Sequence, residues 1–418
     1  MTDRKTIYVY ESWTGEKPIL MGLLYVESLR GKEACSFEYA DPWLEACDRT
    51  YTLDPDLKLF RGRQYAPMDK TMFGLFSDSC PDRWGRRLMD RREGIAAKRE
   101  NRRPRQLLET DYLLGVHDEA RMGALRFALE KDGPFLSRES EMPAPPWVAL
   151  RQLEAASLAF ERDSDRFNDK WLRQLLAPGS SLGGARPKVT VKAADGSLWI
   201  AKFPSSKDDH DVGAWEQVTH ELAKACGLNV PESKLERYSG DGSTYLTKRF
   251  DRQGEKRIHF SSALALLGKK DGASADDGSS YLELVEFIRA FGASPKQDLK
   301  ELWRRIVFSM AVTNTDDHLR NHGFLLTKNG WRLSPLYDVN PNPVGEVLAL
   351  NVSLDNSRID AGLAMEVAQF FGIENAKAEM ESIFSTVKSG WRHQAEKCGL
   401  DRHAQNAMES AFSLCEGI

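Results

Sequence analysis

The pattern of apolar residues changes along the second half of this 418-residue chain, and that change constrains the fold more than any other feature. Residues 188–250 contain four runs of strand-like alternation, and the first two are separated by Asp195-Gly196, a pair typical of a β-hairpin turn. Apolar residues recur at helical spacing over 212–226, and from about Phe260 onward the pattern is mostly helical. The sequence therefore predicts an α+β protein in which a β-rich region is followed by an α-rich region.

The N-terminal part of the chain has a β pattern of its own. Its first 30 or so residues alternate between apolar and polar side chains, with turn residues between the runs. A segment rich in Pro, Ser and Glu at 134–146 is typical of a linker. We therefore predict three regions, which are an N-terminal subdomain at 1–135, a small β-rich lobe at 148–255 and a helical lobe at 256–418.

The charge balance argues against one class of function. The chain has 58 basic and 62 acidic residues and a net charge of −4, which disfavours a nucleic-acid binder that works by bulk charge. Ten basic residues are concentrated at 83–105, where we predict a helix. We interpret this run as a solvated helix face, with a contact to a partner or to nucleic acid as the alternative.

The sequence also indicates a cellular setting. Its six cysteines are scattered and form no C-x-x-C pair, which indicates neither a zinc site nor a disulfide framework. The first residues lack the apolar segment of a signal peptide, and no stretch near 20 apolar residues occurs. We therefore expect a soluble cytoplasmic protein with no membrane span.

A Gly/Ser-rich loop precedes the predicted hairpin. It has the sequence SSLGG at 180–184, and the second strand of the hairpin carries Lys202. Glycines let backbone N–H groups approach phosphate oxygens closely, and a nearby lysine adds a compact positive charge. The pattern alone is also typical of an ordinary turn beside a lysine.

A second motif, NTDDHLRN, contains Asp316 and Asn321 at the D-x-x-x-x-N spacing of a kinase catalytic loop. A carboxylate can accept the proton of an attacking hydroxyl, and an amide oxygen suits the hard cation Mg²⁺. His318 and His322 stand four residues apart and could bind a metal together with Asp317. No further ligand cluster supports zinc, so we interpret His318 as a residue that holds the loop by hydrogen bonding.

A third motif is the aspartate that follows the next predicted hairpin. Asp338 stands where kinases place a second metal-binding carboxylate, although an aspartate near Asn-Pro is also typical of a turn. Glu216, in the predicted helix 212–226, would pair with Lys202 as in kinases, or would lie on the surface. The order of loop, lysine, helix acid, D-x-x-x-x-N and aspartate favours phosphoryl transfer.

Six strings closely resemble the HipA family of bacterial serine/threonine kinases, the toxins of HipBA-type toxin–antitoxin modules. They are SSLGGARPK, IAKFP, WEQVTHELAKACGLNVPES, LTKRFDR, NTDDHLRNHGFLL and SPLYDVNP. The resemblance extends over nearly the whole chain, and it is looser in the N-terminal strings FSDSCPDRWGRR and GALRF. It implies a two-lobed, protein-kinase-like fold with a β-rich N-terminal subdomain and an α-helical C-terminal lobe.

The resemblance implies a role for each matched residue. Asp316 would be the catalytic aspartate, with His318 beside it in the same loop, and Asn321 and Asp338 would bind Mg²⁺. The ATP-binding residues would be Ser181, Gly183, Gly184, Lys188, Lys202, Lys248 and Phe250. We therefore expect side chains that are far apart in the sequence to meet around one metal-bound nucleotide.

The resemblance further implies an activity, which is Mg-ATP-dependent phosphorylation of a protein. The target would be an aminoacyl-tRNA synthetase or another translation component. Ser181 matches the autophosphorylated serine of the family, with Ser180 as the adjacent alternative, and a phosphate there would repel ATP. The implied partners are a small HipB-like helix-turn-helix antitoxin and, through it, operator DNA.

Two other functions stay open. One is a small-molecule phosphotransferase on the same scaffold, and the other is a catalytically idle module in a DNA-bound repressor complex.

Overall fold

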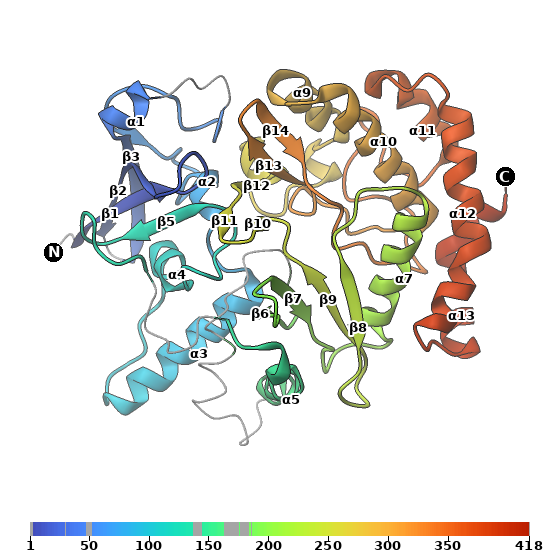
Figure 1. The fold of residues 1–418 in the computed structure, drawn as a ribbon, viewed down its shortest axis with the longest axis horizontal. Coiled ribbons are helices and arrows are strands. Elements are labelled where there is room, and N and C mark those ends of the chain that lie inside the picture. The colour runs from blue at the N-terminus through green and yellow to red at the C-terminus, as the bar shows by residue number, and fades with distance from the viewer. Residues whose placement is uncertain are drawn as a thin grey trace. The chain divides into compact units, whose positions relative to one another are not determined.

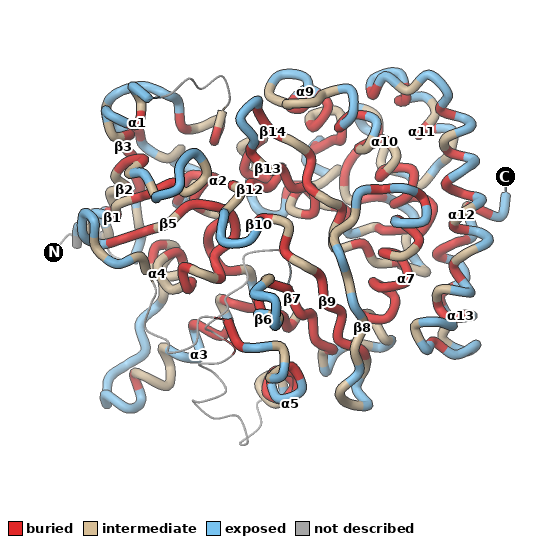
Figure 2. Tube along the Cα trace, viewed as in Figure 1, coloured by how far each residue is buried: buried red, intermediate tan, exposed pale blue. Residues whose placement is uncertain are grey.

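The structure is a computed structural model that describes residues 3–29, 31–46, 52–136, 144–162, 175, 184 and 186–417. The chain divides into two compact units. Figure 1 labels the helices and strands of both. The first unit contains Met1–Ser206 and Asp251–Ser261, and the second contains Lys207–Phe250 and Ser262–Ile418. Each unit has its own buried interior, as Figure 2 shows. The division into three regions that the sequence suggests stays a prediction.

The first unit contains an antiparallel sheet of five strands in the order β4-β3-β2-β1-β5. Alternate side chains of its long strands are buried, as the period-2 pattern predicts; Ile7 and Val9 in β1 are both 0% exposed. The strands are β1 (Asp3–Glu11), β2 (Ile19–Leu29), β3 (Lys32–Tyr39), β4 (Gln64–Tyr65) and β5 (Leu125–Ala128).

The helices of the first unit include the predicted basic one, which ends at Arg99 and so leaves the basic residues at 102–105 outside it. In α3 the side chain of Asp82 caps the helix by accepting a hydrogen bond from Gly85 N at 2.8 Å, and Trp84 and Leu88 are buried. The described helices of this unit are α1 (Asp41–Glu45), α2 (Gly74–Ser77), α3 (Arg83–Arg99), α4 (Glu109–Gly115), η1 (Trp147–Ala149) and α5 (Leu150–Glu161).

Two hairpins complete the first unit. The predicted hairpin is confirmed as β6 (Lys188–Lys192) and β7 (Leu198–Lys202), and Gly196 in its turn has a φ of 84°, which glycine adopts readily. The second hairpin is β10 (Arg252–Gln253) with β11 (Lys256–Arg257), and the short strand β12 (Phe260–Ser262) follows it.

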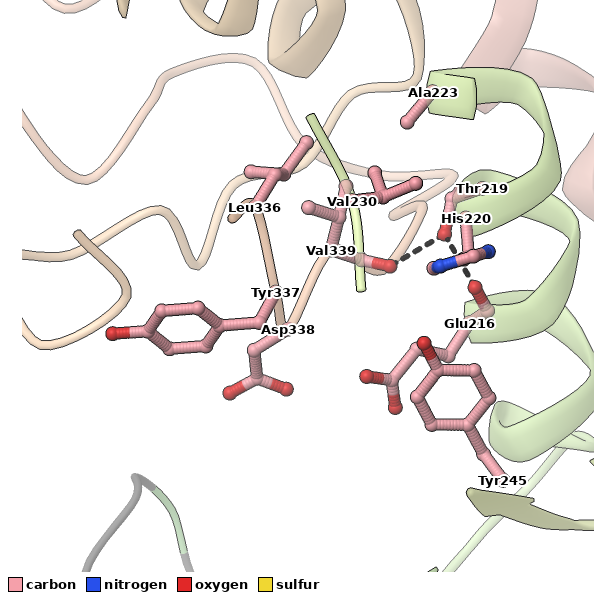
Figure 3. Close-up of a pocket in the computed structure, with 10 residues that line it drawn as sticks. All are labelled: Glu216, Thr219, His220, Ala223, Val230, Tyr245, Leu336, Tyr337, Asp338 and Val339. Atoms are coloured by element: carbon pink, nitrogen blue, oxygen red, sulfur yellow. Dashed lines mark hydrogen bonds between the residues drawn. The ribbon is translucent and has the colours of Figure 1, made fainter. Parts of the chain in front are cut away.

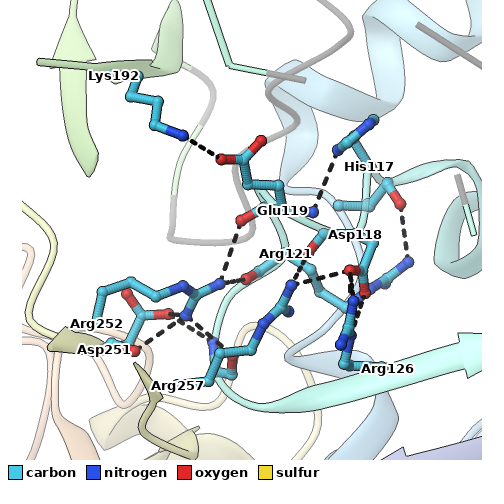
Figure 4. A network of polar contacts seen from close by, with 11 residues as sticks. His117, Asp118, Glu119, Arg121, Arg126, Lys192, Asp251, Arg252 and Arg257 are labelled. Atoms are coloured by element: carbon cyan, nitrogen blue, oxygen red, sulfur yellow. Dashed lines mark hydrogen bonds and ion pairs between the residues drawn. The ribbon is translucent and has the colours of Figure 1, made fainter. Parts of the chain in front are cut away.

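A network of buried charges holds the β10–β11 hairpin to the segment before β5 (Figure 4). Asp251 is 0% exposed; its Oδ2 accepts a hydrogen bond from Gly123 N at 2.8 Å and pairs with Arg252 at 2.5 Å. Asp118 pairs in the same way with Arg257 at 2.9 Å. Because each buried carboxylate has a guanidinium partner, these charges are compensated inside the unit.

His259 gives the first unit a pH dependence. Its ring is 1% exposed and stacks on Trp13 with a centroid distance of 4.5 Å. Burial lowers the pKa of His259 to about 3, so below pH ~6.5 the unfolded chain binds a proton that the folded unit does not. Stability is therefore lost as the pH falls from ~6.5 toward 3.

We expect a His259→Phe variant to keep the stacking and to lose this pH dependence. Between about pH 7.5 and about pH 5, the decrease in unfolding free energy should be smaller than in the wild type by about 2 kcal/mol. Hydrogen exchange of the β1–β5 amides measures this difference. The same pH dependence in both proteins would contradict the account.

The second unit is mainly helical, and α10 lies at its centre. Trp303 and Ile306 of α10 are 0% exposed, and the helix contacts α9, α11 and α12. Its strands are β8 (Ser233–Glu236), β9 (Thr244–Lys248), β13 (Gly323–Thr327) and β14 (Gly330–Leu333). Its described helices are α7 (Val212–Ala225), α8 (Ala263–Leu266), η2 (Ala275–Asp277), α9 (Tyr281–Phe291), α10 (Pro295–Ala311), α11 (Ala361–Val367), η3 (Ala368–Phe371), α12 (Ala376–Lys397), α13 (Arg402–Met408) and η4 (Glu409–Glu416). Within the described residues, no helix is both long and apolar enough to cross a membrane.

Helix α7 begins where the backbone of another segment approaches it closely. A Cβ atom built on Gly213 would lie 2.2 Å from the carbonyl oxygen of Ser243, a distance that real Cβ atoms do not tolerate. We expect Gly213→Ala to lower the free energy of unfolding by about 1–3 kcal/mol, because the helix must shift. Gly240→Ala is the matched control, since no heavy atom lies within 4 Å of its added Cβ. Chemical denaturation of both variants measures the effect, and equal stability of the two would contradict this packing.

Candidate active site

The NTDDHLRN motif forms the loop between α10 and β13. The side chain of Asp316 is 83% exposed, whereas Asn321 is buried and 2% exposed. Nδ2 of Asn321 donates a hydrogen bond to the backbone oxygen of Asp316 at 2.8 Å. The loop therefore presents the carboxylate of Asp316 to solvent and fixes the amide of Asn321 against the backbone of the same residue.

The amide oxygen of Asn321 is buried and has no hydrogen-bond partner among the residues that the structure describes. Because the carbonyl of Asp316 can only accept, the hydrogen bond from Nδ2 sets the orientation of the amide and leaves Oδ1 facing away. A buried oxygen without a partner costs about 1–3 kcal/mol. A ligand with a positive charge or a donor hydrogen would remove that cost.

The segment that contains Asp338 lies along the same loop. Two hydrogen bonds join the segment to the loop, from Tyr337 Oη to Arg320 O at 2.7 Å and from Asn340 N to Asn314 Oδ1 at 3.3 Å. A third runs from Ser334 N to Gly323 O, in the first residue of β13, at 2.8 Å. Asp338 itself has a φ of 59°, in the left-handed region that few residues other than glycine adopt. Backbone strain of this kind is concentrated at functional sites.

Asp338 and Glu216 line one pocket of the second unit. Figure 3 shows the carboxylate of Glu216 directed from α7 into the space toward the segment that contains Asp338, whose own carboxylate points downward in this view. Thr219 joins the two sides by donating a hydrogen bond to Val339 O at 2.6 Å. Burial, together with the charges of Glu216 and Asp338, raises the pKa of Tyr245 in the same pocket. Two carboxylates at one pocket make the binding of a cation favourable.

The residues expected to bind ATP have different surroundings. Lys188 is buried, and its Nζ lies 3.0 Å from Asp82 Oδ2 in the first unit, a contact that the sequence did not predict. Lys248 at the end of β9 lies 3.1 Å from Glu232, and the ring of Phe250 lies 5.6 Å from that of Tyr337.

Several expectations about individual residues stay predictions. Lys202 is the last residue of β7 in the first unit, and Glu216 belongs to the second unit. The pairing of the two side chains stays a prediction. Gly184 is exposed and has a φ of 89°. Ser180, Ser181 and Gly183 lie outside the described residues.

Two expectations about this loop can be compared with its geometry: the hydrogen bond of His318 and the alternative zinc site. Nε2 of His318 lies 3.9 Å from Oδ1 of Asp316, which is too long for a hydrogen bond. Within the described ranges, no group of three or more His, Cys, Asp or Glu side chains is arranged to hold a metal ion. The sequence analysis gave no role to Thr219 or to Asn314, because nothing in their spacing indicates that their side chains fix the segment that contains Asp338.

The family model of the HipA-like C-terminal domain matches residues 180–409, which is more than half of the chain. The chain belongs to the HipA-like family. The matched range includes Asp316, Asn321 and Asp338, and the recognition made from the six sequence strings is confirmed.

Curated relatives have names that describe a kinase-like family. A candidate kinase of Haemophilus influenzae is 29% identical over 228 residues, which cover 48% of this chain and 66% of that protein. A candidate kinase of Sinorhizobium fredii is 30% identical over 38% of this chain and 41% of its own length. The serine/threonine-protein kinase toxin HipA of Shewanella oneidensis is 26% identical over 39% of this chain and 43% of the toxin. The chain thus spans less than two thirds of the length of these relatives.

A solved structure supports the fold over nearly the whole chain. It is HipA of Shewanella oneidensis in a complex with HipB and operator DNA, with a TM-score of 0.63 and 16% identity. The match covers 98% of this chain and 97% of that one. The expected α+β, HipA-like fold class is therefore confirmed.

Proposed function

We propose that this protein is an Mg-ATP-dependent serine/threonine protein kinase of the HipA toxin type. One observation carries the proposal: the buried amide oxygen of Asn321, which has no partner among the described residues, lies in the same loop as the exposed carboxylate of Asp316. The first group is suited to a metal ion and the second to an incoming hydroxyl. The family membership of the chain supports the same chemistry.

The residues present fit Mg²⁺. Asn321 offers a neutral oxygen with no other partner in the described part of the chain, and Asp338 offers a carboxylate in a pocket that Glu216 also lines. Mg²⁺ prefers such oxygen ligands, and when bound it neutralises the charge that develops on a transferred phosphoryl group. Asn321 and Asp338 would hold the ion.

The other residues would bind and orient the substrates. Asp316 would orient the hydroxyl of the target and accept its proton, with His318 beside it in the loop. Lys202 and residues 180–188, which include Lys188, would position the triphosphate, and the backbone at 248–250 would lie against the adenine. Catalysis would then consist of positioning and charge stabilisation.

The exposure of Asp316 favours a large substrate. Its side chain is 83% exposed, so a serine or threonine on the surface of a folded protein can reach the carboxylate. We therefore place the hydroxyl on a protein, such as an aminoacyl-tRNA synthetase or another translation component. The solved HipA complex with HipB and operator DNA supports a small antitoxin of the HipB type as a partner of this chain, with DNA bound through it.

The test is incubation of the purified chain with Mg-ATP, followed by mass spectrometry of the intact protein and of its peptides. The proposal expects phosphate on Ser181 or Ser180, where it would inhibit the enzyme by repelling ATP. Nucleotide consumption that transfers phosphate only to small molecules would replace the proposal with a small-molecule kinase. If the chain binds no nucleotide, the alternative of a catalytically idle module would replace the proposal.

A further inference from the structure

Two buried residues of the loop, Asp317 and His322, contact each other next to the candidate active site. Asp317 directly follows Asp316, and His322 directly follows Asn321. Asp317 is 2% exposed and His322 is 1% exposed. Oδ1 of Asp317 lies 3.0 Å from Nε2 of His322, although the contact is not aligned as a regular hydrogen bond. The immediate neighbours of the two site residues are thus paired inside the unit.

The carboxylate of Asp317 also anchors the loop to two helices. Its Oδ2 accepts a hydrogen bond from Tyr281 Oη at 2.7 Å and another from Ser309 Oγ at 3.2 Å. Tyr281 is the first residue of α9, and Ser309 lies near the end of α10. The Tyr281 ring packs edge-on against His322 at a centroid distance of 5.5 Å. One carboxylate therefore connects α9, α10 and the residue that precedes β13.

The charge of Asp317 is maintained by these partners. Burial by itself would raise the pKa of Asp317, but His322 and the hydroxyls of Tyr281 and Ser309 lower it overall. A buried carboxylate that stays ionised needs its partners in fixed positions, because an uncompensated buried charge is costly. The loop is therefore held rigidly at this point.

We propose that Asp317 and His322 are positioning residues that set the spacing of Asp316 and Asn321. The proposal rests on the proposed function, because it concerns the same metal site. The hydrogen bond from Asn321 to the backbone oxygen of Asp316 is a second contact between the two ends of the loop. Loss of the contact between Asp317 and His322 would let the two ends of the loop separate. The oxygen of Asn321 would then no longer be held in place for a metal. Residues that orient metal ligands typically contribute about 10- to 100-fold to metal affinity.

The test is the binding of Mn²⁺, as a paramagnetic substitute for Mg²⁺, in the presence of a non-hydrolysable ATP analogue. Electron paramagnetic resonance measures free and bound Mn²⁺ for the wild type, Asp317→Asn and His322→Gln. We expect both variants to raise the Mn²⁺ dissociation constant by about 10- to 100-fold. The double variant should differ little from each single one, because both remove the same contact. Tyr281→Phe is the milder variant if Asp317→Asn does not fold, and we expect a smaller increase in the same direction.

The control distinguishes positioning from general destabilisation. Asp298 is also a buried carboxylate of the second unit, 4% exposed, and it pairs with Arg332 at 2.9 Å away from the NTDDHLRN loop. Asp298→Asn should lower the melting temperature and leave Mn²⁺ affinity unchanged. Wild-type Mn²⁺ affinity in the folded variants of Asp317, His322 and Tyr281 would overturn this inference alone. A wild type that binds no Mn²⁺–nucleotide would overturn the proposed function as well.

Discussion

Replacing Asp316 with asparagine is expected to lower kcat for phosphoryl transfer by about 100- to 10,000-fold, the range contributed by a positioned general base. Asparagine has the same shape as aspartate but cannot accept the proton of the attacking hydroxyl. Because the side chain is 83% exposed, the substitution should leave the melting temperature and nucleotide binding unchanged. Transfer of radiolabelled phosphate from ATP to the protein measures the effect.

A matched control separates this effect from the loss of one surface charge. Glu381 on α12 is also an exposed carboxylate of the second unit, and it is 3.8 Å from Lys377. Glu381→Gln should retain wild-type phosphate transfer. Equal phosphate transfer by Asp316→Asn and the wild type would remove Asp316 from the catalytic role.

Replacing Asp338 with asparagine should lower kcat by about 100- to 1,000-fold, the effect of losing one preorganised electrostatic group. The substitution removes a charge from the pocket that Glu216 also lines, and the dependence of activity on Mg²⁺ should shift to higher concentrations. Asparagine is chosen because it tolerates the left-handed backbone that Asp338 adopts at a φ of 59°. The fold should therefore be kept while the activity is lost.

An alanine at the same position separates the backbone effect from the chemical one. Asp338→Ala should lose activity to a similar extent, and it should also lose about 1–3 kcal/mol of stability because alanine is strained at this φ. Asp132→Asn is a control at another left-handed aspartate, with a φ of 58°, in the first unit. A normal Mg²⁺ dependence in Asp338→Asn would contradict the assignment of this carboxylate to the metal.

The local parts of the fold were predictable because their signals lie within a few residues. The Asp195-Gly196 pair determines a turn through the backbone conformations that these residues adopt, and the β6–β7 hairpin follows from it. The spacing of apolar residues likewise predicts α7, in which Trp215, Val218 and Leu222 are buried. The D-x-x-x-x-N spacing brings Asp316 and Asn321 together because one short loop contains both residues.

Contacts between distant segments were not predictable in this way. Lys188 was expected to bind ATP, and its buried contact with Asp82 depends on tertiary packing that periodicity does not report. Residues 314–322 form turns, so the four-residue spacing of His318 and His322 does not place them on one helix face. His322 is consequently buried against Asp317, while His318 is partly exposed.

A crystal structure of the protein with Mg²⁺ and a non-hydrolysable ATP analogue tests the central claim most directly. The account predicts that Oδ1 of Asn321 and the carboxylate of Asp338 coordinate the ion, with the terminal phosphate facing Asp316 and Lys202 at the triphosphate. A nucleotide bound elsewhere, or an ion that touches neither Asn321 nor Asp338, would contradict it.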